Sequence, residues 1–104
     1  MSKSDMPDTS GKRNPAGIYT PEWRAATRGM TFEERGFTAC VVAAMQHADL
    51  PAPTPQQAAA AFDISFEDAA RLLDVFASIP QDVVDGQIER FSELPAALVQ
   101  EFLP

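Results

Sequence analysis

The 104-residue sequence has only one cysteine and one histidine. A single cysteine excludes an internal disulfide and a cysteine-rich zinc site, and Cys40, inside an apolar pattern, is expected to be a small core residue. Any nucleophile–base pair that uses histidine would need His47, and no glycine-framed serine, phosphate-binding loop or dinucleotide fingerprint is present. We therefore predict a protein that is not an enzyme and that uses no cofactor and no metal.

The sequence also lacks long apolar runs. None approaches the roughly 20 residues that cross a bilayer, and Met1-Ser2-Lys3-Ser4-Asp5 has no apolar signal-peptide core. We expect a soluble, cytoplasmic protein that makes no contact with a membrane. The length suits one domain with one modest core.

Cations are scarce: eight lysines and arginines face 15 acidic residues, for a net charge of −7. The imbalance lies in residues 36–104, where only Arg71 and Arg90 oppose ten acidic residues. Such a surface should repel DNA and attract basic protein surfaces. The alternative is that the acidic residues only keep a small domain in solution.

The chain divides into two parts. Residues 1–19 are polar and interrupted by proline and glycine, which predicts a flexible arm. Residues 20–104 are predicted to form a single helical domain. Its first helix should begin at Thr20-Pro21, which places a capping hydroxyl before a proline, and end near Gly29.

Further capping signals predict the other helices. Thr31-Phe32-Glu33-Glu34 is a capping box that opens a long central helix, which should stop before Leu50-Pro51. Thr54-Pro55-Gln56-Gln57 opens a short helix to about Phe62. Ser65 caps the next helix, which Pro80 ends, and Ser92-Glu93-Leu94-Pro95 is expected to start a terminal helix.

Between the last two helices, Val83-Val84-Asp85-Gly86-Gln87-Ile88 places an Asp-Gly pair between β-favouring residues, which predicts a β-hairpin. Its arms are only about three residues each, so an irregular loop is the alternative. The predicted fold is mainly α: a small helical bundle that contains a helix-turn-helix and is winged-helix-like if the hairpin forms.

The helix-turn-helix prediction rests on apolar spacing at Ala59, Ile64, Ala69 and Leu72, where such a motif packs its two helices together. The exposed start of its second helix would enter a DNA groove. Here that start carries acidic residues and one cation, Arg71. The spacing thus favours nucleic acid while the charge opposes it.

The segments around Trp23 and Met30-Thr31-Phe32-Glu33-Glu34-Arg35-Gly36 resemble the YdaU-like domain of phage and prophage proteins. A looser similarity continues through Leu50-Pro51 to Val84-Asp85-Gly86-Gln87-Ile88, so that it covers about residues 20–91. The resemblance implies a winged-helix-like module of mobile-element genes, sometimes found beside replication functions, without an established activity.

Two functions are predicted. The first is a non-enzymatic phage or mobile-element protein that binds a basic host or phage protein, as an inhibitor or nucleic-acid mimic of a DNA-handling machine, in the manner of an anti-CRISPR protein. Its predicted partner-binding residues are Asp63, Ser65, Phe66, Glu67, Asp68, Arg71, Asp74 and Asp85. The alternative is a helix-turn-helix module that binds DNA in replication initiation or transcription regulation. Specific DNA binders commonly contact about six to ten phosphates, and the acidic body offers few cations for this.

The oligomeric state stays open at this point. Phe66, Phe76 and Phe102 present much aromatic surface for so small a core. A homodimer through the terminal helix would cover it. Burial within one chain is the alternative.

Overall fold

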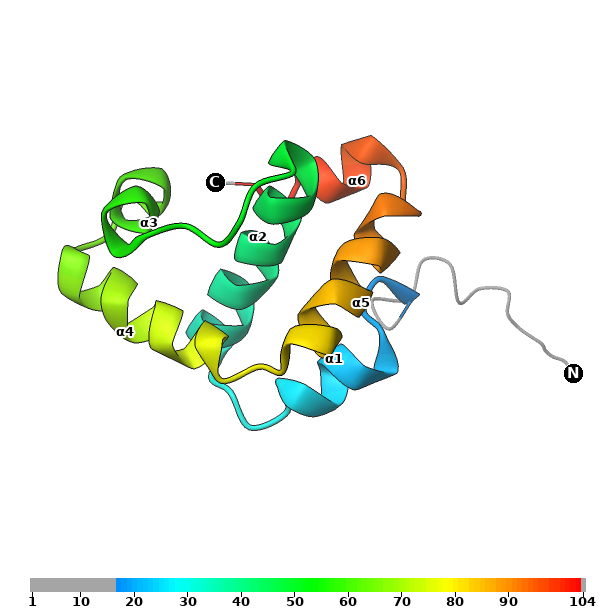
Figure 1. Ribbon diagram of the computed structural model, residues 1–104, viewed down its shortest axis with the longest axis horizontal. Coiled ribbons are helices and arrows are strands. Elements are labelled where there is room, and N and C mark those ends of the chain that lie inside the picture. The colour runs from blue at the N-terminus through cyan, green and yellow to red at the C-terminus, as the bar shows by residue number, and fades with distance from the viewer. Residues whose placement is uncertain (1–16, 104) are drawn as a thin grey trace, which may run out of the picture.

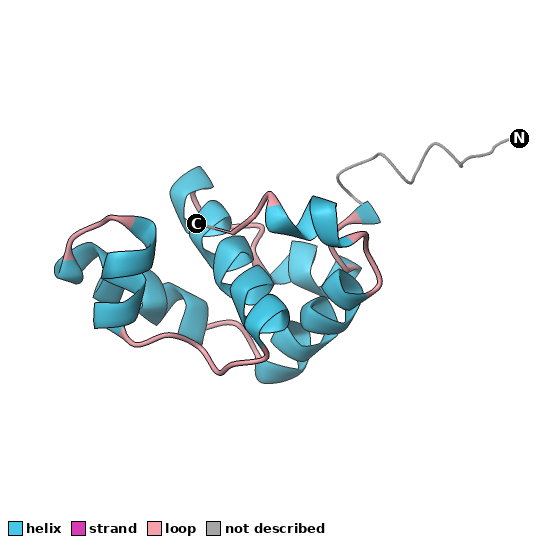
Figure 2. Ribbon diagram, turned by 90° about the horizontal axis from the view of Figure 1, so that it is seen from above, coloured by secondary structure: helices cyan, strands magenta, loops and turns pink. Residues whose placement is uncertain are grey.

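The computed structural model describes residues 17–103, which form helices joined by loops and contain no strand (Figures 1 and 2). Most of the predicted arm, residues 1–16, lies outside the described residues. The helices are α1 (Pro21–Ala26), α2 (Phe32–Ala48), α3 (Pro55–Phe62), α4 (Phe66–Ala77), α5 (Gln81–Ser92) and α6 (Ala96–Gln100).

The predicted caps begin four of these helices. The side chains of Thr20, Thr31, Thr54 and Ser65 each accept a hydrogen bond from the backbone N–H three residues later, at 3.0 to 3.2 Å. In the capping box of α2, Glu34 Oε1 also accepts from the Thr31 N–H at 3.0 Å. These bonds satisfy donors that have no partner within the helix, so the helix starts were readable from local sequence.

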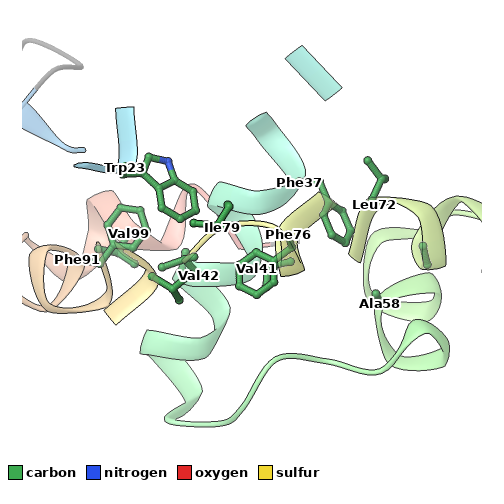
Figure 3. Close-up of a cluster of buried hydrophobic side chains, with 13 residues drawn as sticks. Trp23, Phe37, Val41, Val42, Ala58, Leu72, Phe76, Ile79, Phe91 and Val99 are labelled. Carbon is green, nitrogen blue, oxygen red and sulfur yellow. The ribbon is translucent and has the colours of Figure 1, made fainter. Parts of the chain in front are cut away.

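Helix α2 is the centre of the core. Figure 1 shows it between the α3–α4 pair on one side and α1, α5 and α6 on the other, and it contacts α4, α5 and α6. Val41, Val42 and Ala43 have no exposed surface. In Figure 3, Trp23, Phe91 and Val99 lie at one end of the buried cluster and Leu72 and Ala58 at the other.

The predicted hairpin is wrong, because residues 81–92 form α5. An Asp-Gly hairpin turn needs positive φ angles, and Gly86 has none. Val84, Gln87 and Phe91 instead share one helical face, and all three are buried. Burying that face against α2 and α1 outweighs the β-favouring local sequence and the roughly 1 kcal/mol that a glycine costs inside a helix. The described residues therefore contain no wing.

The last helix also begins later than predicted. Ser92 is the final residue of α5, and α6 starts at Ala96 after Pro95. The predicted cap at Ser92 fails because the apolar face of α5 continues to Phe91, which is 1% exposed.

Residues 17–19, which were predicted to belong to the flexible arm, lie against the domain. The side-chain amide of the fully buried Gln87 accepts a hydrogen bond from the Thr20 N–H at 2.9 Å and donates one to the Ile18 carbonyl at 3.0 Å. Arg90 Nε donates to the Gly17 carbonyl at 2.8 Å. The ring of Tyr19 packs edge-on against the rings of Phe91 on α5 and of Phe102. This segment is thus held to α5 by polar contacts that no periodicity in the sequence signals.

We expect Gln87→Ala to lower the free energy of unfolding by about 2 kcal/mol or more, because it leaves a cavity and removes the partners of two backbone groups. Urea denaturation measures this value. Gln81→Ala is the matched control: Gln81 is exposed on the same helix and donates only to Asp85, so its change should stay within about 0.5 kcal/mol. Equal effects of the two substitutions would contradict the structural importance of the Gln87 amide.

Candidate functional site: the exposed face of α4

Helices α3 and α4 pack against each other as the predicted helix pair. Ala69 and Leu72 are buried, and Ala59 and Ile64 are half-buried against the core, so all four predicted packing positions face inward. Ala58, which the spacing did not single out, is fully buried as well. This packing leaves the other side of α4 free of core contacts.

The turn between the two helices is set by Asp63. Its backbone is left-handed, with φ 56° and ψ 50°, and its N–H donates to the Ala59 carbonyl. Aspartate tolerates this conformation better than most non-glycine residues. Asp63 therefore has a structural function in ending α3, in addition to placing a carboxylate on the surface.

The exposed face of α4 consists of Glu67, Arg71 and Asp74. A helix has about 3.6 residues per turn, so these positions lie opposite the buried positions 69, 72 and 76. Asp68 lies beside them at the helix start, where its N–H donates to Ser65 Oγ at 3.0 Å. The positive end of the helix dipole stabilises carboxylates in this first turn.

Arg71 is engaged by two carboxylates. Its Nη2 lies 3.3 Å from Glu33 Oε1 on α2 and 3.4 Å from Asp68 Oδ1. Hydrogen bonds to Glu33 and then to Asp68 raise the pKa of Arg71 above its usual value, so the side chain stays charged. We call this contact the Glu33–Arg71–Asp68 cluster. The cluster pairs the single cation of α3 and α4 with two carboxylates, one of them from the start of α2.

The other arginines in residues 17–103 lie elsewhere. Arg24 is on α1, Arg28 follows that helix, and Arg35 is near the start of α2, where its Nη2 donates to the Arg28 carbonyl at 3.0 Å. Arg90 on α5 bonds to the Gly17 carbonyl and pairs with Glu93 at 3.3 Å. The described part of α3, α4 and their turn therefore carries four acidic residues against one paired cation.

The structure brings most of the predicted site together. Asp63, Ser65, Phe66, Glu67, Asp68, Arg71 and Asp74 all lie on α4 or the turn before it, and all are exposed. Asp85 lies apart on α5, because the hairpin that was to carry it next to α4 does not form.

Sequence reasoning missed Glu33 as a residue of this site. Its carboxylate reaches α4 through Arg71, and the residue before it, Phe32, is 90% exposed. A signal was present: Thr31-Phe32-Glu33-Glu34 and Ser65-Phe66-Glu67-Asp68 share the order hydroxyl, phenylalanine, acid, acid. Only the packing of α2 against α4 brings Glu33, in the first of these two segments, close to α4.

Outside the face of α4, three other features bear on function: the Cys40 thiol, possible metal ligands and the length of the helices. Cys40 is half-buried, and burial raises the pKa of its thiol, which therefore stays protonated at neutral pH. Among residues 17–103, no group of three or more histidine, cysteine or acidic side chains is placed to hold a metal ion. Within the same residues, no helix combines the length and apolar character needed to span a membrane.

No protein-family model matches this chain, and neither a curated protein nor a solved structure is found to be similar to it. The resemblance to the YdaU-like domain therefore stays a prediction from the motif residues.

The left-handed backbone at Asp63 predicts an unusual ranking of substitutions. Asp63→Gly should be more stable than Asp63→Ala by about 1 kcal/mol, because only glycine adopts this conformation without a steric cost. Urea denaturation of both variants gives the difference. At Glu89, which is exposed in the interior of α5, the order should reverse, with alanine better than glycine by about 0.5 to 1 kcal/mol. The same order at both sites would show that the conformation of Asp63 does not control the turn.

Proposed function

We propose that this protein binds a partner protein with a basic surface through the exposed face of α4, and that it performs no catalysis. In this proposal it is a phage or mobile-element protein that inhibits a host DNA-handling machine, or imitates nucleic acid toward it. The observation that carries the proposal is the state of Arg71: the one cation of the helix pair is held by Glu33 and Asp68.

Charge argues for a protein partner over DNA. Residues 17–103 contain 13 acidic residues and five arginines. A phosphate approaching α4 would meet Glu67, Asp74 and a cation that already has two carboxylates. A lysine- or arginine-rich groove that normally holds phosphates would instead find carboxylates displayed along a helix.

A nucleic-acid-binding module is the second candidate, and one observation favours it. Arg24, Arg28 and Arg35 are all exposed, and Arg35 reaches the Arg28 carbonyl, so the last two lie together at the turn between α1 and α2, while Arg24 lies on α1. They would contact phosphate through that turn and not through α4. Three cations are fewer than the about six to ten phosphate contacts common in specific binders.

Charge reversal on α4 tests the protein-binding proposal. We expect Glu67→Lys with Asp74→Lys to abolish capture of the partner in a pull-down from bacterial lysate, with captured proteins identified by mass spectrometry. Both residues are exposed, so the fold should persist with little change in melting temperature. The matched control, Asp82→Lys with Glu89→Lys on α5, changes the net charge equally and should keep the same partner. Equal capture by both variants would mean that the α4 carboxylates only solvate the surface.

A gel-shift titration with random DNA duplexes at low salt separates the two candidates. The protein-binding proposal predicts no complex at micromolar protein, since the net charge repels the duplex. Affinity tighter than about micromolar that falls steeply with salt would support the nucleic-acid alternative. In that case Arg28→Ala with Arg35→Ala should weaken binding, while Glu67→Lys with Asp74→Lys should strengthen it.

A further inference from the structure

Helix α4 carries apolar side chains between its buried side and its acidic face. They are Phe66, Ala70 and Leu73, which follow each other at intervals of four and three residues. With 3.6 residues per turn, they lie within about 60° of one another around the helix axis. Phe66 is 52% exposed, and the other two are half-buried. We call these three residues the α4 apolar strip.

The folded domain makes little use of this strip. Ala69, Leu72 and Phe76 supply the buried side of α4, and of the strip only Leu73 packs partly against the core. The start of the helix does not need Phe66, because the capping bond joins the Ser65 hydroxyl to a backbone N–H. Within residues 17–103, an aromatic side chain on a regular helix is thus left in water beside further apolar surface.

The charges that edge the strip on its own helix are negative. Glu67 and Asp74 lie about 40 to 60° farther round α4, opposite the buried side, and Asp63 lies in the turn before the helix. Arg71 lies beyond these two carboxylates, within the Glu33–Arg71–Asp68 cluster. The neighbouring helix α3 contains no charged residue. On α3, α4 and their turn, carboxylates therefore border the strip on its solvent side.

The exposed arginines of α1 and α2 lie away from Phe66. Arg35 bonds to the Arg28 carbonyl, which places its guanidinium at the turn after α1. Figure 1 shows that the start of α4, where Phe66 lies, is the end of this helix farther from α1 and that turn. The negative edge of the strip near Phe66 is thus not offset by these cations.

The spacing of the strip matches a second helix. Residues at i, i+4 and i+7 form a row along α4, against which another helix can lay its own apolar face. An extended segment repeats its side chains every two residues and matches this row poorly. Carboxylates along one edge would pair with lysine or arginine beside that apolar face, as charged residues do at the edges of a coiled-coil seam.

We propose that the α4 apolar strip binds an amphipathic helix of the partner protein, with lysine or arginine along the edge that faces Glu67 and Asp74. Phe66 makes the main contact, because it is the most exposed large side chain of the strip. This inference rests on the proposed function and narrows the partner from any basic surface to a helix with a basic edge. A second copy of α4 would bring the same carboxylates to this edge, and DNA would bring phosphates, so both are repelled.

Phe32 supplies a matched control. It is the first residue of α2, as Phe66 is the first residue of α4, and each follows a capping hydroxyl. Phe32 is 90% exposed, so a peptide that only seeks an exposed aromatic ring would prefer it to Phe66. Phe66→Ala and Phe32→Ala thus remove the same side chain from equivalent helix positions on and off the strip.

The experiment uses the full chain and two synthetic helical peptides with the same content of leucine, lysine and alanine. One has its leucines on a single face edged by lysines, and the other has them spread evenly around the helix. Isothermal titration calorimetry measures the affinities. We expect the wild type to bind the first peptide about tenfold more tightly than the second, and Phe66→Ala to reduce this preference to about twofold. Phe32→Ala should keep the preference, and both variants should melt within about 2 °C of the wild type.

The outcomes separate this inference from the proposed function. If Glu67→Lys with Asp74→Lys weakens binding of both peptides while Phe66→Ala keeps the preference, the acidic face stands and the apolar strip is overturned as a binding surface. Loss of the preference in Phe32→Ala, and not in Phe66→Ala, overturns it too. If the charge-reversed variant binds both peptides as the wild type does, the proposed function fails and this inference with it. Concentration-dependent self-association in sedimentation that Phe66→Ala removes would make a second copy the occupant and also overturn the inference.

Discussion

The packing of other helices around α2 is the constraint on which the rest of the structure depends. Val41, Val42 and Ala43 have no exposed surface because α4, α5 and α6 all contact this helix. Of the 14 buried hydrophobic residues in the described part of the chain, five lie on α2, more than on any other helix. This helix also decides the state of its neighbours, since a segment that offers α2 a continuous apolar helical face gains more by burial than local propensity can oppose.

The same packing produces the candidate site. Phe37 on α2 lies against Phe62 of α3, with ring centroids 4.8 Å apart. Leu72, on the inner side of α4, is buried in the core. With that side fixed, the acidic residues of α4 face outward and the start of α2 comes within reach of Arg71. The Arg71 ion pairs are exposed, so they add little stability. Their importance is electrostatic: they leave the helix pair without an unpaired cation in the described residues.

Prediction from sequence succeeded where the structure depends on near neighbours along the chain. The capping residues Thr20, Thr31, Thr54 and Ser65 act over three residues, and each was identified from its pattern. The inward positions of the α3–α4 pair were also found, because helical spacing is a local property. The exposure of Glu67, Arg71 and Asp74 followed, since the inward face of a helix defines its outward face, while their function in binding stays a prediction.

The sequence by itself determined the helical class, four helix starts, and the acidic outer face of α4, all of which depend on caps, periodicity and charge. Only the tertiary structure decided that residues 81–92 are a helix, because the buried face formed by Val84, Gln87 and Phe91 overrides an Asp-Gly turn signal. It alone also placed Asp85 away from α4 and brought Glu33 next to Arg71. The physical reason is the same in each case: contacts between residues distant in sequence choose among conformations that local preferences leave close in energy.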